Sequence, residues 1–155
     1  MINGLLTVLC GALGAWEEAA HIERMPGKGG AKMSKILKAF LMGFLSFFLF
    51  FAIFEAASEN LGDAGEVLAF ILMAAYFFFC QFRLSRGNPD ANRKDWPVML
   101  ALDIIWIALF IGMVLTERRE VVIAQGLVIL VGCFGTTWAG AFAASMKARR
   151  KREQI

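Results

Sequence analysis

Apolar residues gather along this chain in long blocks that short polar stretches separate. Four blocks are almost uninterrupted, at 36–57, 65–84, 97–116 and 121–146. When it is wound as a helix, each block is apolar all round, whereas a surface helix of a soluble domain keeps a polar face. About 20 residues at 1.5 Å per residue cross the ~30 Å hydrocarbon core of a bilayer. The blocks therefore predict four membrane-spanning helices.

The polar stretches between the blocks have the composition of turns and loops. Residues 58–65 and 85–96 are rich in Gly, Asn, Asp and Ser, and Pro97 stands where the first turn of a helix accepts proline. The connection 117–120 is so short that the last two blocks must be antiparallel neighbours. We expect an all-α polytopic membrane protein, with a four-helix transmembrane bundle over 35–146 and a basic C-terminal tail.

The N-terminal segment, 1–34, has a different pattern. Its first 16 residues are almost wholly apolar, but a helix of that length is only about 24 Å long, shorter than the ~30 Å core. Its large apolar residues recur at helical spacing, which favours a helix lying in the membrane interface. The small residues Gly4, Gly11 and Ala15 equally fit a fifth spanning helix. Both interpretations stay open, and the Gly-rich stretch 25–30 predicts a flexible hinge.

Lysine and arginine are distributed unevenly over the connections. Fourteen of the 16 lie in the N-terminal part up to Lys38, at 83–96 or in the tail at 147–155, and the other two fall between the third and fourth blocks. Loops rich in Lys and Arg stay in the cytoplasm. We therefore expect the loop at 83–96 and the C-terminus in the cytoplasm, with 58–65 and 117–120 on the opposite side. This pattern is typical of the bacterial inner (plasma) membrane.

The same basic residues are placed to contact anionic lipid. Each Lys or Arg near an anionic leaflet adds ~1 kcal/mol of attraction. The residues expected to make such contacts are Arg83, Arg86, Arg93 and Lys94 in the loop and Lys147, Arg149, Arg150, Lys151 and Arg152 in the tail. The first expected partner is therefore a bilayer with an anionic cytoplasmic leaflet. Because the basic groups form topological blocks, no nucleic-acid partner is expected.

Composition excludes several classes of protein. The chain is 59% apolar and 19% charged, against roughly 45–50% and about 25% in soluble domains. Its one His and three separate Cys provide no metal-ligand spacing, so we expect no metal and no cofactor. No span contains paired carboxylates or a pair of histidines, and the sequence shows no Ser with a nearby base and no phosphate-binding Gly loop, so we do not expect an enzyme.

Asp103 is the one charged residue inside the third block. A charge near the centre of a spanning helix costs on the order of 2.5–3.5 kcal/mol, so this side chain should face a partner or water rather than lipid. Tyr76, Thr136 and Thr137 are expected at a similar depth, and Lys38 has a stem long enough to reach toward them. This polar layer is either a cation or proton site or a hydrogen-bonded carboxyl that fixes the helix register.

Small residues recur every four positions in the last block, at Gly132, Thr136, Gly140 and Ala144, and Gln125 lies near the same face at its far end. Such spacing lets two helix backbones approach closely. We expect this face to pack against another helix of the same chain or against a second copy.

These features leave two main functional hypotheses. The first is a small integral membrane protein that acts as a non-catalytic subunit or an accessory or assembly protein of a membrane complex, through helix–helix packing with other membrane subunits or with itself. The alternative is a small oligomeric channel or transporter with an intramembrane acidic site at Asp103.

Overall fold

The computed structural model describes residues 34–117 and 120–154, and these residues form helices without a strand. The helices are α2 (Lys35–Leu61), α3 (Asp63–Leu84), α4 (Ala91–Lys94), α5 (Trp96–Glu117) and α6 (Glu120–Glu153). Within the described residues, four helices, all but the short α4, are long and apolar enough to cross a membrane. The prediction of an all-α polytopic bundle is therefore confirmed. The interfacial helix, fifth span and hinge predicted before residue 34 lie outside the described residues, as do residues 118–119.

The first two spanning helices are longer than the apolar blocks that predicted them. Ser34 caps α2, since its Oγ accepts a hydrogen bond of 3.1 Å from the backbone N–H of Leu37. At the other end the polar stretch 58–65 is almost entirely helical, and one residue, Gly62, separates α2 from α3. The reversal is possible because Gly62 takes a φ of +56°, which glycine adopts without steric cost.

The basic tail is also helical. α6 continues through it to Glu153, so the tail is the last part of a spanning helix rather than a separate segment. Three cations, Arg150, Lys151 and Arg152, occupy its last turn, where positive charge stabilises the negative end of the helix dipole. The loop before α5 contains the single-turn helix α4, which packs on α5 and α6.

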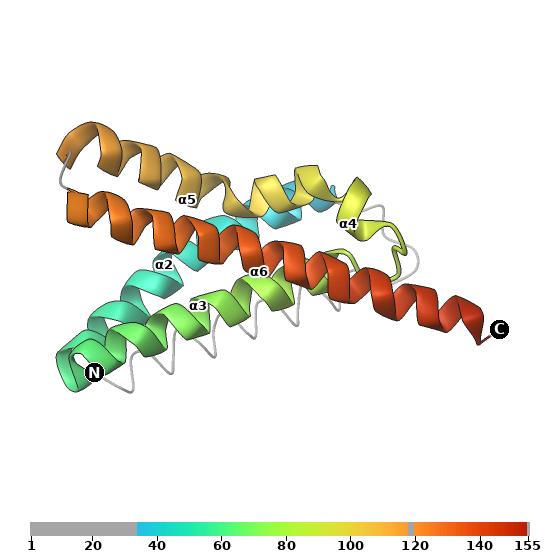
Figure 1. Cartoon of the computed structure of the whole chain (residues 1–155), viewed down its shortest axis with the longest axis horizontal. Helices are drawn as coiled ribbons and strands as arrows, with labels where there is room; N and C mark the ends of the chain where they lie inside the picture. Colours follow the sequence, from blue (N-terminus) through green and yellow to red (C-terminus); the bar gives the residue numbers. More distant parts are fainter. Residues whose placement is uncertain (1–33, 118–119, 155) are drawn as a thin grey trace, which may run out of the picture. The chain divides into compact units, whose positions relative to one another are not determined.

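The four long helices surround one apolar core. Figure 1 shows α6 running alongside both α3 and α5, and α2 contacts the same two helices from the other side. The indole of Trp106 lies near the centre, with its ring centroid 5.2 Å from that of Phe50 and 6.2 Å from that of Phe77. Leu102 and Cys133 are fully buried beside this cluster. The same core contains the polar side chains described below.

Candidate functional site

Asp103 lies inside the bundle and is hydrogen-bonded to α6. The side chain is fully buried, and its Oδ2 accepts a hydrogen bond of 3.1 Å from Thr137 Oγ1. The same threonine hydroxyl lies 2.9 Å from the carbonyl oxygen of Phe134 and 3.1 Å from that of Cys133, so one proton is shared among three acceptors. Asp103 Oδ1 is buried without a hydrogen-bond partner among the described residues. The contact joins α5 to α6 and leaves one carboxyl oxygen unused.

Tyr76 forms a second tie, between α3 and α2. Its phenolic O–H donates a 3.0 Å hydrogen bond to the backbone carbonyl of Met42. The next residue, Gly43, lies so close to α5 that a Cβ on it would overlap the carbonyl of Leu102. Because Leu102 precedes Asp103, the two ties lie at nearly the same level of the bundle. Tyr76, Asp103 and Thr137 therefore belong to one layer.

A third tie was not predicted from the sequence. The indole N–H of Trp106 donates a 2.9 Å hydrogen bond to Ser46 Oγ, which in turn donates to the carbonyl of Gly43. Both side chains are buried. A tryptophan in mid-span carries an N–H that needs an acceptor, and this requirement is the one signal in the sequence that could have indicated the pair.

The other two members of the predicted layer are placed differently. Thr136 is half-buried, and its hydroxyl bonds back to the carbonyl of Gly132 at 2.7 Å on its own helix. Lys38 is half-buried on α2, one turn before Met42. Thr136 is therefore not brought to Asp103, because adjacent residues of a helix point about 100° apart and Thr137 takes the inward position.

The polar layer joins the helices through hydrogen bonds. No group of three His, Cys, Asp or Glu side chains that could hold a metal ion occurs in the part of the chain that the structure describes. Asp103 forms no ion pair with any described residue. What the layer offers chemically is one buried carboxyl oxygen, Oδ1, that can accept a further hydrogen bond or a proton.

The face of small residues on α6 is divided along its length. Gly140 and Ala144 are buried, and a Cβ on Gly140 would lie 2.5 Å from the carbonyl oxygen of Phe78, so this part packs tightly on α3. Gly132 has open space around it and Gln125 is exposed. Residues four positions apart are rotated by about 40° from one another on a helix of 3.6 residues per turn, so the first and last members of the series point in different directions. The part at Gly140 and Ala144 is therefore covered by α3, and the part at Gln125 and Gly132 is open.

A second buried polar pair lies near that contact and was also missed. Gln81 and Ser85 are fully buried on α3, and Gln81 Nε2 donates a 2.8 Å hydrogen bond to Ser85 Oγ. Gln81 Oε1 has no partner among the described residues. The pair lies at the end of a Phe-rich block, where one glutamine four residues before a serine gives no distinctive pattern.

The basic residues gather at one end of the bundle, where the tail and the loop meet. Arg149 Nε donates a 3.1 Å hydrogen bond to the carbonyl of Pro89, and Arg149 Nη2 lies 3.9 Å from a carboxylate oxygen of Asp90. Asp90 also pairs with Lys94 at 3.4 Å. The Lys147 ammonium lies 5.7 Å from the centre of the Phe82 ring. The remaining predicted lipid contacts, all exposed, are Arg83, Arg86, Arg93, Arg150, Lys151 and Arg152.

No protein-family model, curated protein or solved structure matches this chain. The chemistry of its own side chains is therefore the basis for the function proposed next.

Proposed function

We propose that the protein is a non-catalytic subunit or assembly protein of a membrane complex and acts through its helix faces. The main support comes from the hydrogen bonds that polar side chains make within the spans. Tyr76, Trp106 and Thr137 each donate a hydrogen bond to another helix, so these donors hold the bundle together. A bundle fixed internally in this way presents its outer faces to lipid or to another protein.

Some outer positions of α5 and α6 have the character of helix–helix contacts. Gly132 and Gly135 on α6 have open space where a side chain would project, and so does Gly112 on α5. Lipid gains nothing from small residues, whereas a neighbouring helix approaches closely over them and gains van der Waals contact. These open positions support a partner helix, either from another subunit or from a second copy.

Purification in a mild detergent with mass measurement tests this function. We expect the native chain to be recovered with fixed partners or as a defined oligomer, and the variant Gly132→Leu/Gly135→Leu to be recovered without them. The matched control is Val128→Leu/Val131→Leu, which adds bulk to exposed positions of the same helix that already carry large side chains. Recovery of the native chain as a monomer without partners would contradict the proposal.

A second candidate function rests on one observation, the unpartnered oxygen of the buried Asp103. Intramembrane acids of this kind occur on ion and proton pathways. For a small channel or transporter, purified protein in liposomes should conduct ions or protons, and Asp103→Asn should abolish the flux while the helical content stays unchanged. Flux that persists in this variant excludes Asp103 as the site.

We propose that the protein lies in the plasma membrane with its basic end in the cytoplasm. The excess of Lys and Arg at that end supports it. A cysteine placed at Asn88 should resist an impermeant thiol reagent in intact cells, and one placed at Glu59 should react. The two described native cysteines, Cys80 and Cys133, are buried. The opposite labelling result would reverse the orientation.

A further inference from the structure

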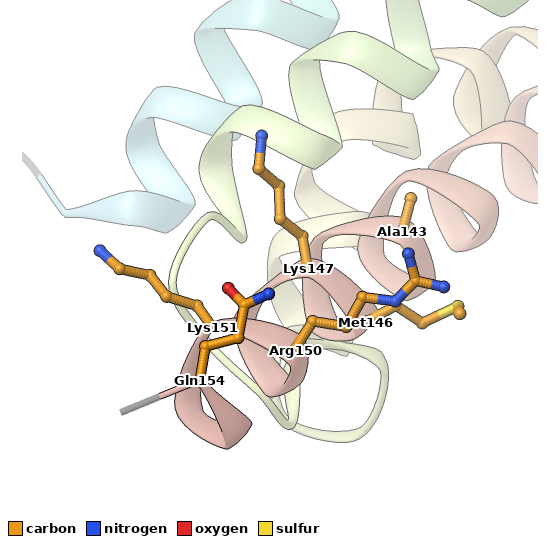
Figure 2. Close-up of a pocket in the computed structure, with 6 residues that line it drawn as sticks. All are labelled: Ala143, Met146, Lys147, Arg150, Lys151 and Gln154. Carbon is orange, nitrogen blue, oxygen red and sulfur yellow. The ribbon is translucent and has the colours of Figure 1, made fainter.

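A shallow hollow opens along the C-terminal part of α6. Figure 2 shows the side chains that line it, which all come from this helix: Ala143, Met146, Lys147, Arg150, Lys151 and Gln154. Their spacing of three and four residues places them on one side of α6. The hollow is apolar where it begins, at Ala143 and Met146, and cationic where the helix ends. It therefore combines two chemistries along about three turns of helix.

The cations of the hollow differ from their neighbours in what they contact. Arg149 is turned toward the carbonyl of Pro89 and the carboxylate of Asp90. By contrast, Arg150 and Lys151 are exposed and form no ion pair with any residue that the structure describes. Lys147 lies over the Phe82 ring of α3. The anion that would neutralise Arg150 and Lys151 is therefore not supplied by the described chain.

The hollow also lies where the apolar surface of α6 ends. Trp138, Phe142 and Met146 are exposed along the helix, and Lys147 is the first charged residue after them. An apolar surface that gives way to cations along a membrane-spanning helix marks the level of the lipid headgroups. A ligand that fits an apolar surface followed by cations has an apolar chain and an anionic head.

We propose that this hollow binds one acidic phospholipid. The exposed side chains of Arg150 and Lys151, which Figure 2 shows extending to opposite sides, turn toward its phosphate, and its acyl chain follows Met146 and Ala143. Arginine suits the phosphate because its planar guanidinium donates two parallel hydrogen bonds to an oxyanion. The proposal is independent of whether the protein is a subunit or a transporter.

Lipid titration with native mass spectrometry tests the site. The full-length chain in phosphatidylcholine-containing micelles is titrated with phosphatidylglycerol, and the lipid retained per chain is counted. The variant Arg150→Gln/Lys151→Gln is expected to bind the lipid at least tenfold more weakly than the native chain, because each near-surface cation adds attraction to an acidic lipid. The control, Arg86→Gln/Arg93→Gln, removes the same charge from expected lipid contacts of the loop and α4 that lie outside the hollow. It measures the general attraction to an acidic lipid and should weaken binding less than threefold.

Three results would overturn the proposal. Equal losses in both variants would mean general attraction to an anionic surface, and no loss in either would mean that the hollow does not bind the lipid. Binding of inorganic phosphate as tight as that of phosphatidylglycerol would make it a free-phosphate site. Circular dichroism should be unchanged, because the substituted residues are exposed. If Arg150→Gln/Lys151→Gln loses helix, the single variants Lys151→Gln and Arg93→Gln are compared for lipid binding in the same way.

Discussion

The two halves of the bundle are packed in different ways. We call the half that contains the start of α2 and α5 the basic half, and the half that contains Gly62 and the end of α5 the turn half. In the basic half α5 is buried at Val98, Leu102 and Trp106, whereas in the turn half Leu115 is 74% exposed. α2 follows the same trend, since its last buried residue is Phe50. On α3 the buried residues run from Gly65 to Leu84, and on α6 those described run from Gly126 to Ser145, so these two helices are packed in both halves.

The interhelical hydrogen bonds are concentrated in the basic half. Three of those described between side chains of spanning helices and another helix, from Tyr76, Trp106 and Thr137, lie between the basic end and the middle of the bundle. A fourth, of 3.5 Å from Ser58 Oγ to Glu66 Oε1, joins α2 to α3 in the turn half.

Close backbone approach occurs in both halves. Lipid tails are as apolar as leucine, so helices in a membrane are held together by close backbone approach and polar contacts rather than by apolar burial. A Cβ on Gly43 would overlap the carbonyl of Leu102 on α5, and one on Gly65 would overlap the carbonyl of Ala57 on α2. In the basic half such contacts join all four long helices, whereas in the turn half they join α2 to α3. The comparison indicates that the basic half specifies the packing of the bundle, and that α5 and α6 in the turn half are the part left available to a partner.

The largest expected effect comes from filling the closest helix contact of the basic half. Gly43→Val would place a side chain against the carbonyl of Leu102, so α2 and α5 must separate. We expect a loss of about 3 kcal/mol or more in the free energy of unfolding, measured by denaturation in mixed micelles. Gly132→Val is the control from the turn half, where a Cβ meets open space. Equal losses in the two variants would remove the distinction between the halves.

A smaller loss is expected from Ser46→Ala. The substitution leaves the buried indole N–H of Trp106 without its acceptor, which costs roughly 1–3 kcal/mol. The double variant Ser46→Ala/Trp106→Phe removes both partners and should recover part of the loss, although Phe fills less of the core. The same unfolding measurement applies. A Ser46→Ala protein as stable as the native chain would show that this tie does not hold α2 to α5.

The tie between Asp103 and Thr137 is expected to be weaker still. A double-mutant cycle with Asp103→Leu and Thr137→Val removes one partner in each single variant and should give a coupling of about 0.6–1.7 kcal/mol, the average and maximum found for hydrogen bonds between membrane helices. Thr137 also has two carbonyl acceptors on its own helix, which limits the energy of the pair. Thr136→Val, cycled with Asp103→Leu, is the control. Coupling as large for Thr136 as for Thr137 would contradict the observed geometry.

The smallest effect should come from an open glycine of the turn half. Gly112→Ala adds a methyl group to open space and should change the free energy of unfolding by less than about 0.5 kcal/mol. If the turn half contacts a partner, Gly112→Ala should nevertheless weaken the oligomer or complex seen by size-exclusion chromatography. A stable monomer at every concentration, unaffected by the substitution, would argue for a lipid-facing surface.

The sequence predicted the elements of this fold better than their contacts. The four spans follow from the thickness of a bilayer, which sets block length without reference to tertiary structure. The end of α2 was harder to predict, because the polar residues after Ala57 have the composition of a turn. In the structure they stay helical, and a single glycine with positive φ reverses the chain. A helix can continue through polar residues when the turn itself requires only one position.

The candidate site shows the same limit. Asp103 stands out because a charge in an apolar block is costly. Its hydrogen-bond partner does not stand out, because the adjacent residues Thr136 and Thr137 fit that role equally well in the sequence. The choice between Thr136 and Thr137 depends on the rotation of α6, which the sequence does not give. Gly43 and Ser46 were harder to recognise, since their role depends on which residue of α5 lies opposite. Register between helices, not composition, determines these contacts.

The length of α6 has a mechanical consequence. Its 34 residues form one unbroken helix, about 51 Å long at 1.5 Å per residue, which exceeds the ~40–45 Å of a whole bilayer with its polar regions. The part of this rod beyond Thr137 is held as well, because Gly140 packs against α3 and Arg149 contacts Pro89 and Asp90. One uninterrupted element therefore sets the distance between the buried polar layer and the charged end of the protein.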